Sequence, residues 1–232
     1  MGAMVKEAYN KKVKQLADFL DESESQGVKS FELQTGILGY LNMLRHITGL
    51  AKVEPVIEYI DEFLASENGS GEKITIFHHH IDVGDVLTIK LEELFPGSTI
   101  RIVSQDDSGT RQKKIDEFRT DPSKRILIAP TLACGEGINL QFCSHSIIME
   151  REWNPANEEQ AEGRFSRIGS NAERILVNYP TGTGTIDEFL TEMVERKRQY
   201  VNEALDGQSP KWEESDIIRE LASKVVAKWR LQ

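Results

Sequence analysis

"RILIAPTLACGEGINL", residues 125–140, joins an apolar run to a segment that contains two closely spaced glycines. The run at 125–129 predicts a buried β-strand, because aliphatic and β-branched residues follow one another there. Gly135 and Gly137 allow the backbone to approach a ligand closely, and the amides of a helix that follows them would face that ligand. Two glycines alone are weak evidence, but these follow a strand, and open α/β sheets bind their ligands there.

Four further strand-like runs occur on either side of this one, and amphipathic stretches separate them. The runs are "KITIFH" (73–78), "TIRIV" (99–103), "SIIME" (146–150) and "RILVNY" (174–179). Stretches with helical spacing lie between them at 83–95, 110–120 and 154–168. This alternation predicts an α/β fold, in which helices cover a parallel sheet on both faces and the crossovers are right-handed.

Helical patterns flank the predicted sheet at both ends of the chain. In the first part, Leu, Ile, Val and Phe recur at helical spacing, with interruptions at Gly27, Gly36, Gly49 and Pro55. After Ile186 we predict a long helix to about Leu205, followed by a last amphipathic helix at 215–229. We therefore expect a helical segment (1–68), an α/β domain (69–207) and a C-terminal helical extension (208–232).

The composition limits the class of protein. The 232 residues can bury one main core, and the two cysteines are expected to be free thiols in a reducing compartment. We see no signal peptide and no membrane-spanning run, so we expect a cytoplasmic or nuclear protein. The net charge of −10 excludes nucleic-acid binding by bulk electrostatics alone. Residues 1–4, "MGAM", are typical of an expression remnant, which predicts that the chain is part of a longer protein.

The helix predicted in 154–168 has start and stop signals at its ends, namely Asn154, Pro155 and Gly169. On this helix Gln160, Arg164 and Arg167 share one face, because residues three and four positions apart are neighbours. A pair of guanidinium groups at the rim of a sheet suits a phosphate whose negative charge grows during transfer. From the pattern alone, a salt-bridged surface stripe is an equally good interpretation.

The stretch "LACGEGINLQFCSHSIIMEREWNPANEEQAEGRFSRIGS", residues 132–170, resembles the last two helicase motifs of the Swi/Snf-like branch of superfamily two. "KITIFHHH" (73–80) resembles the strand that opens the second RecA-like lobe of these DNA-dependent ATPases. The resemblance extends over roughly residues 33 to 207. It implies that 69–207 is a RecA-like helicase C-terminal domain, and that the chain is the second motor lobe of an ATP-dependent translocase acting on double-stranded DNA.

The same resemblance implies roles for individual residues. Arg164 and Arg167 would reach the γ-phosphate of ATP, and Gln160 would couple the nucleotide to the moving lobe. Contacts with the nucleotide and the DNA backbone would come from Gly135, Glu136, Gly137 and Asn139. The remaining DNA-binding candidates are the linking residue Trp153 and the basic residues Arg111, Lys113 and Lys114. Without the resemblance, a solvated helix face is the favoured interpretation of these basic residues.

The first half of an ATPase site is not present in this sequence. The nearest candidate for a phosphate-binding loop, "NGSGEKIT" (68–75), fails because Lys73 does not follow its glycine directly. "PTGTGTID" (180–187) lacks a lysine and is better interpreted as a turn that Thr185 caps into the next helix. We therefore expect ATP and Mg²⁺ to bind only together with the N-terminal lobe of the same polypeptide, and this chain alone to be inactive.

Two alternatives remain open at this point: a lobe of another superfamily-two helicase, and a non-catalytic module that binds nucleic acid or protein. Other chemistry is less well supported by the residues. The rings of His78, His79 and His80 are expected to point to alternate faces of a strand, so they would not ligate one metal together. No familiar metal-site spacing includes Cys134, Cys143 and His145, and packing roles are predicted for them.

Overall fold

The computed structural model describes residues 2–26, 30–66, 71–135, 138–165, 175–205 and 214–231. The chain forms two compact units. One is continuous, Lys52–Pro180, and contains every strand of the described chain. The other combines Met1–Ala51 with Thr181–Gln232 and is helical. We call them the sheet unit and the helical unit.

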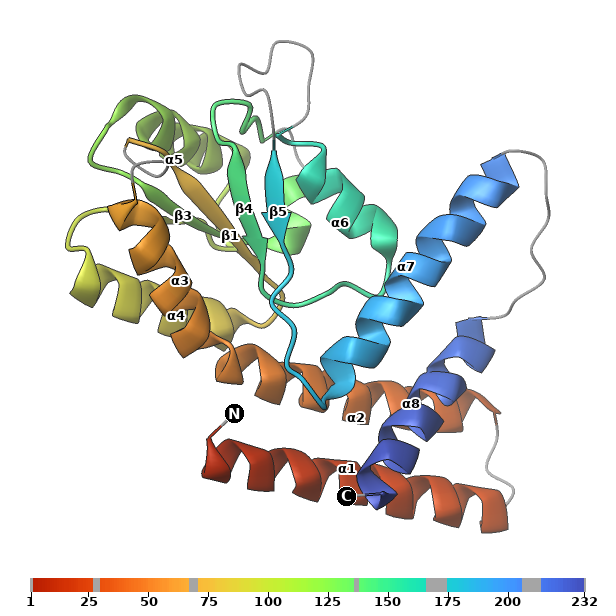
Figure 1. The fold of residues 1–232 in the computed structure, drawn as a ribbon. Coiled ribbons are helices and arrows are strands. Elements are labelled where there is room, and N and C mark those ends of the chain that lie inside the picture. Colours follow the sequence, from red (N-terminus) through yellow and green to blue (C-terminus); the bar gives the residue numbers. More distant parts are fainter. Residues whose placement is uncertain are drawn as a thin grey trace. The chain divides into compact units, whose positions relative to one another are not determined.

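The sheet unit is built on five parallel strands (Figure 1). They are β1 (Ile74–His78), β2 (Thr99–Arg101), β3 (Ile126–Pro130), β4 (His145–Ile148) and β5 (Leu176–Asn178). Their spatial order is β2-β3-β1-β4-β5. In the register of the central strand, Ile74 pairs with Ile126 on one side and with His145 on the other. The five predicted strands and their parallel arrangement are confirmed.

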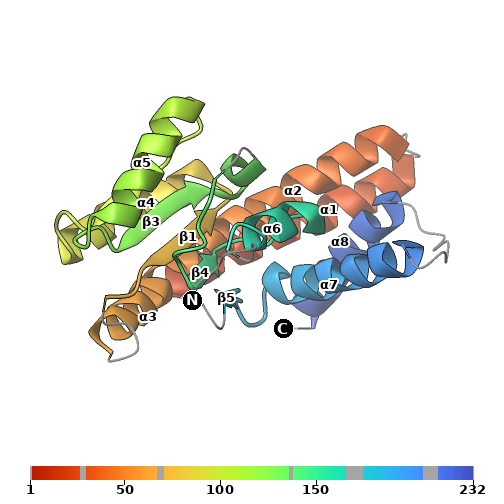
Figure 2. The same ribbon diagram turned by 90° about the horizontal axis from the view of Figure 1, so that it is seen from above.

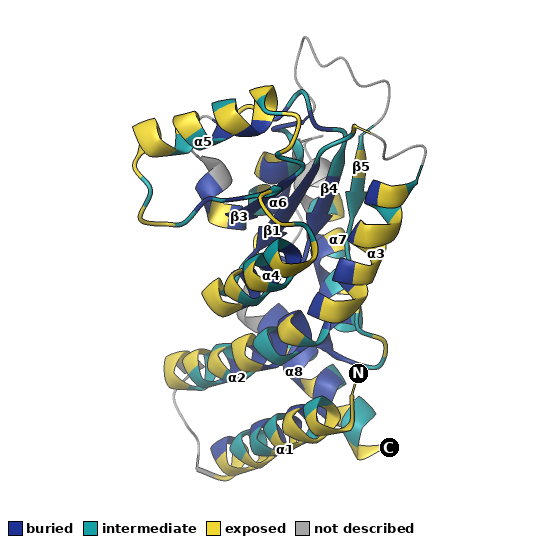
Figure 3. Ribbon diagram, turned by 90° about the vertical axis from the view of Figure 1, so that its left-hand side faces the viewer, coloured by how far each residue is buried: buried dark blue, intermediate teal, exposed yellow. Residues whose placement is uncertain are grey.

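Helices cover both faces of this sheet, as predicted. Alternate residues of each strand point to opposite faces. On β1, Ile76 belongs to the core under α3 (Val53–Ala65) and α4 (Ile81–Leu94). Its neighbour Phe77 belongs to the core under α5 (Ser108–Thr120) and α6 (Pro155–Glu162). Figure 3 shows the buried strands between helices whose outer sides are exposed.

A buried thiol stabilises the amino-terminal edge of the sheet. Cys143 is a free cysteine, as predicted, and its Sγ lies 3.0 Å from the carbonyl oxygen of Lys73. Burial raises the pKa of this thiol to about 11. Cys143 is therefore a packing residue that stays protonated at neutral pH. The side chain of Cys134 lies outside the described residues.

The helical unit is formed by α1 (Ala3–Gln26), α2 (Ser30–Ala51), α7 (Ile186–Leu205) and α8 (Glu214–Arg230). Helices α1 and α2 lie side by side, and α8 packs against both of them (Figure 2). Apolar residues spaced three and four apart bury one face of each helix, for example Val13, Leu16, Ile37 and Leu41. The predicted long helix from Ile186 to Leu205 is confirmed.

The predicted interruptions at Gly36 and Gly49 are wrong, because both glycines lie inside α2. Gly36 has a packing reason: a Cβ at this position would stand 2.3 Å from the ring of Phe19 on α1. Pro55 lies in the first turn of α3, where the missing N–H costs no helical hydrogen bond. Gly27 lies outside the described residues.

The start of α7 is held by hydrogen bonds from three parts of the helical unit. Thr185 caps it as predicted, because its Oγ1 accepts a hydrogen bond from the N–H of Asp187 at 3.2 Å. The Tyr9 hydroxyl of α1 accepts from the N–H of Ile186 at 2.7 Å. On α2, Thr48 donates to the Asp187 carboxylate at 2.9 Å. The first two bonds satisfy amides that every helix leaves open at its beginning, and the third holds the Asp187 side chain.

Among the described residues, no helix combines the length and the apolar character that crossing a membrane requires.

Candidate functional site at the carboxyl edge of the sheet

All five strands end at the same edge of the sheet, so the segments that follow them meet there. The β3 strand continues into a short 3₁₀-helix, η1 (Thr131–Gly135), and β4 leads through residues 149–154 into α6. Helix α6 packs against η1. This packing brings the segment that follows β3 and helix α6 together.

A pocket of about 420 Å³ opens at this edge. Its walls come from the ends of β1 and β3, from η1 and from the start of α5; they include His79, Ser104, Arg111, Thr131 and Glu152. Two apolar residues at the pocket, Ile81 and Leu132, are each 62% exposed. The edge therefore presents one guanidinium group, hydroxyl groups and apolar side chains side by side.

Two histidine–glutamate pairs join the ends of the neighbouring strands β1 and β4. The Glu150 carboxylate accepts hydrogen bonds from the backbone N–H groups of His79 and His80, both at 2.9 Å. The same carboxylate also bonds the His80 ring, and Glu152 bonds His79 Nδ1 at 2.9 Å. Burial alone would raise the pKa of Glu150, but the hydrogen bonds and the charge of His80 lower it to about 2.

The prediction that the three histidine rings point to alternate faces is wrong for His79 and His80, whose centroids lie 4.9 Å apart. The reason is that β1 ends at His78, so the side chains of the next two residues need not point to opposite faces of the sheet. His78 itself is fully buried, and burial together with the nearby charge of Arg101 lowers its pKa to about 4. Sequence analysis missed the paired glutamates, although Glu150 ends a predicted strand and Glu152 follows it.

A buried ion pair fixes the path from β4 into α6. Arg151 donates to both carboxylate oxygens of Glu158, from Nε at 2.9 Å and from Nη2 at 2.8 Å. Glu158 also accepts from the N–H of Glu152 at 2.8 Å. The Arg151 guanidinium lies 4.3 Å from the centroid of the Tyr179 ring, and the hydroxyl of that ring hydrogen-bonds Glu162 at the end of α6. Both ends of α6 are thereby tied to the sheet.

Helix α6 begins where the sequence predicted, because Asn154 accepts a hydrogen bond from the N–H of Ala156 at 3.1 Å. It ends at Glu162, so the predicted extent to Gly169 is wrong. The chain turns at Gly163, and Phe165 enters the core against Phe77, with ring centroids 6.1 Å apart. Burial of this aromatic ring accompanies the end of α6.

The arginine stripe is described only in part. Gln160 is exposed on α6, whereas Arg164, which we expected at an exposed rim, is 9% exposed. The carbonyl of Arg164 accepts from the N–H of Leu140 at 3.1 Å, so this arginine lies beside the segment that follows the two glycines. Its Nε is buried and has no hydrogen-bond partner among the described residues. Arg167 lies outside the described residues.

The glycine segment is also described in part. Gly135 ends η1, while Glu136 and Gly137 lie outside the described residues. The helix that we expected to follow is not formed in residues 138–144, which are irregular. Asn139 is exposed there, and its side-chain oxygen accepts from the N–H of Gln141 at 3.1 Å. That bond holds a local turn instead of a helix start.

The basic candidates all lie on α5. Arg111 donates to the carbonyl of Ser104 at 3.4 Å, and Lys113 is exposed. Lys114 pairs with Asp106 at 2.6 Å, and this pairing lowers the pKa of Asp106 although desolvation alone would raise it. The acidic charges of the loop thus serve local structure, because Asp107 similarly caps α5 through the N–H of Thr110. Trp153, between β4 and α6, is partly buried.

Comparison with known proteins identifies the fold and the family. Residues 52–169 match the family described as helicase conserved C-terminal domain. The DNA annealing helicase and endonuclease ZRANB3 of Mus musculus is 28% identical over 184 residues, which cover 79% of this chain and 17% of that protein. The Caenorhabditis elegans homolog of SWI/SNF-related matrix-associated actin-dependent regulator of chromatin subfamily A-like protein 1 is 32% identical over 151 residues, covering 65% of this chain and 22% of that protein.

Among solved structures, the Sulfolobus solfataricus SWI2/SNF2 ATPase core in complex with double-stranded DNA has a TM-score of 0.75 at 22% identity. The match covers 98% of this chain and 47% of that one, and it supports the fold alone. This chain spans less than a quarter of the length of the two curated relatives named above. The family match extends over half of the chain, and the parallel sheet with helices on both faces agrees with it. The chain therefore belongs to the helicase conserved C-terminal domain family, as a C-terminal lobe of the Swi/Snf-like type.

Proposed function

We propose that this chain acts as the second motor lobe of an ATP-dependent translocase on double-stranded DNA. ATP would bind between this lobe and an N-terminal lobe of the same polypeptide, and would supply the phosphoryl group that is transferred to water. Arg164 and Arg167 would bind the γ-phosphate from this side, and Gln160 would respond to it at the exposed surface of α6. The lobe alone would leave the phosphate without its other half-site.

The observation that carries this proposal is the state of Arg164. Its Nε is buried beside the glycine segment and has no hydrogen-bond partner among the described residues. A buried guanidinium N–H without an acceptor is unfavourable, and an anion that reaches it can satisfy it. A phosphate oxygen is negatively charged and accepts hydrogen bonds. It can therefore supply the partner that Arg164 Nε lacks among the described residues. The donor chemistry therefore fits the γ-phosphate of ATP.

Mg²⁺ fits this chain less well. The described residues contain no group of three or more His, Cys, Asp or Glu side chains that could hold a metal ion. We therefore propose that Mg²⁺ is held by the phosphates and by the N-terminal lobe. The DNA track of this lobe would run over the pocket at the sheet edge, where Arg111 offers a phosphate contact and the exposed Lys113 offers another. Trp153, between β4 and α6, would link the two sites.

The test uses the complete protein that contains this lobe and measures ATP hydrolysis with and without double-stranded DNA. Arg167→Ala is expected to lower DNA-stimulated turnover by roughly a thousandfold, because the finger stabilises charge that develops in the transition state. Arg219→Ala, an exposed arginine on α8, is the matched control and should keep full turnover. Unchanged turnover in Arg167→Ala would refute the catalytic role and favour a binding module.

A separate measurement addresses the isolated 232-residue chain. We expect it to hydrolyse no ATP and to bind DNA weakly, because half of the nucleotide site is missing and the net charge is −10. DNA-stimulated hydrolysis by the purified chain would contradict the proposed division between two lobes. Strand-displacement and translocation assays on the complete protein distinguish a translocase from a strand-separating helicase of the same superfamily.

A further inference from the structure

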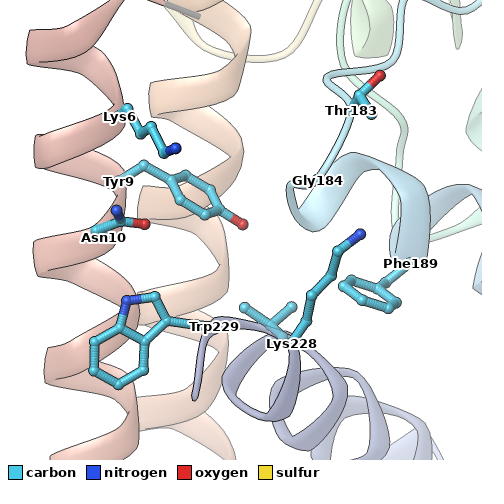
Figure 4. A pocket seen from close by; sticks show the side chains of 9 residues that line it. Lys6, Tyr9, Asn10, Thr183, Gly184, Phe189, Lys228 and Trp229 are labelled. Carbon is cyan, nitrogen blue, oxygen red and sulfur yellow. The ribbon is translucent and has the colours of Figure 1, made fainter. Parts of the chain in front are cut away.

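The helical unit contains a pocket of about 480 Å³ that the proposed motor function does not use (Figure 4). Its walls come from α1, from the loop before α7, from the first turn of α7 and from the end of α8. They are formed by Lys6, Tyr9, Asn10, Thr183, Gly184, Phe189, Val225, Lys228 and Trp229. All nine residues belong to the helical unit, so the pocket is complete without the sheet unit.

Every charged side chain that lines this pocket is cationic. Lys6 is exposed, and its ammonium group has no partner among the described residues. Lys228 shares its charge with Glu188, at 2.5 Å, and its Nζ lies 5.3 Å from the centroid of the Phe189 ring. Glu188 therefore balances the charge of Lys228, and Lys6 supplies the positive charge that favours an anionic ligand in this pocket.

A buried hydroxyl group adds a second donor. Tyr9 is 5% exposed, and its oxygen accepts from the N–H of Ile186 at 2.7 Å. The hydroxyl proton has no acceptor among the residues that the structure describes. Figure 4 shows this hydroxyl and the ammonium groups of Lys6 and Lys228 directed into the same space. A ligand oxygen placed there would satisfy the Tyr9 donor and meet positive charge at once.

The loop before α7 does not itself supply the anion site. Two amides at this turn are already used, since the N–H of Gly182 bonds Asp187 at 3.0 Å and the N–H of Asp187 bonds Thr185. The sequence "PTGTGTID" (180–187) also lacks the lysine of a phosphate-binding loop. The fold supplies lysines from elsewhere, because Lys6 of α1 and Lys228 of α8 both border this loop.

Apolar and aromatic side chains form another part of the pocket wall, beside the polar Asn10 and Thr183. Trp229, Phe189 and Val225 line it, and Phe189 already faces the Lys228 ammonium. The volume exceeds what a single phosphate group requires, so the ligand needs a flat apolar part as well as an anionic part. We propose that this pocket binds a nucleoside phosphate, with the phosphate between Lys6, Tyr9 and Lys228 and the base against the aromatic wall.

The test titrates the purified chain with AMP and follows the indole N–H signal of Trp229 by NMR, after assignment with Trp229→Phe. AMP is expected to shift this signal saturably, and adenosine and inorganic phosphate should each bind at least about tenfold more weakly, because each provides only half of the contacts. A short single-stranded oligonucleotide forms a further arm. If the oligonucleotide binds more tightly than AMP, the ligand of the pocket is part of a nucleic-acid strand. If AMP binds more tightly, the ligand is a free nucleotide.

Two variants test the named donors. Lys6→Gln is expected to weaken AMP binding roughly tenfold, whereas Lys14→Gln, an equal charge change at an exposed position of α1 outside the pocket, should leave it unchanged. Tyr9→Phe should weaken binding roughly three- to tenfold in samples whose folding is checked by thermal melting. Equal effects of Lys6→Gln and Lys14→Gln, the absence of saturation, or equal affinity for inorganic phosphate would each overturn the proposal.

Discussion

Arg151 and Arg164 stand just outside the two ends of α6, and both are buried, but their surroundings differ. Arg151 donates to both oxygens of Glu158 and lies over the Tyr179 ring. Arg164 has a buried Nε without a partner in the part of the chain that the structure describes. A buried charge that its neighbours fully satisfy serves the fold, whereas one that the fold leaves incomplete is open to a ligand. The predictions below test this difference.

Glu158→Gln should have the largest effect on folding. It leaves the Arg151 cation buried without its counter-charge, which typically destabilises a protein by about 3 to 5 kcal/mol. The free energy of unfolding, measured by urea denaturation of the chain, checks this. Glu159→Gln is the matched control. The Glu159 carboxylate is exposed, so this substitution should change the free energy of unfolding by less than about 0.5 kcal/mol. Similar stabilities of the two variants would show that the Arg151–Glu158 pair contributes little.

Acid should weaken the second buried pair on the same edge. The pKa of Glu150 is about 2 in the folded chain against an ordinary value of 4.5. Because the folded-state pKa is lowered, the ionised group adds stability above about pH 4.5 and loses that contribution as pH falls towards 2. We expect a loss of roughly 2 to 3 kcal/mol over this window, measured by denaturation at each pH.

Glu150→Gln should flatten this part of the pH profile, because the variant has no carboxylate to protonate. Glu159→Gln should keep the slope of the unmodified chain. If Glu150→Gln retains the full slope, another carboxylate controls acid unfolding.

Tyr179→Phe should have a smaller effect. The substitution removes the hydroxyl that bonds Glu162 but keeps the ring under Arg151, so we expect a loss of about 1 to 2 kcal/mol. Tyr59→Phe provides the comparison on the other side of β5, where the hydroxyl of the exposed Tyr59 accepts from Asn178 at 3.0 Å. Removing that exposed bond should cost less than about 0.5 kcal/mol in the same denaturation experiment. An equal loss in both variants would argue against a special role of the Glu162 contact.

The sequence predicted the parts of this lobe that depend on local pattern. Runs such as residues 126–130 form strands because both faces of a parallel sheet are buried, and the cap at Asn154 was identified from the residue types alone. The end of α6 was not predicted, because it depends on burial of Phe165 against Phe77, a residue on a distant strand. The histidine–glutamate pairs were missed for the same reason, since they require β1 and β4 to be neighbours.

The helical unit shows the same limit on a larger scale. Sequence analysis assigned its first and last helices to separate parts, and grouped residues 53–65 with the preceding helices. In the structure, α3 instead packs on the sheet. The contact between the Tyr9 hydroxyl and the N–H of Ile186 joins positions far apart in the chain, and no local sequence pattern predicts it. The pocket proposed to bind a nucleoside phosphate exists only through such distant contacts, so it could not have been found from motifs.

Arg164→Gln should change folding stability least, although the side chain is buried as Arg151 is. The Arg164 Nε is buried without a hydrogen-bond partner among the described residues, so its removal relieves a desolvation cost, and the free energy of unfolding should stay within about 1 kcal/mol of the unmodified chain or rise. Arg151→Gln changes the counterpart at the other end of α6. It leaves the Glu158 carboxylate buried without its cation, so the free energy of unfolding should fall by several kcal/mol, about the amount expected for a broken buried pair. In the complete protein, Arg164→Gln should nevertheless lower DNA-stimulated ATP hydrolysis by roughly a hundredfold or more, since the missing charge is needed only when phosphate is present. A large loss of stability in Arg164→Gln would mean that this arginine is held by the fold, and the contrast between the two ends of α6 would no longer point to a nucleotide.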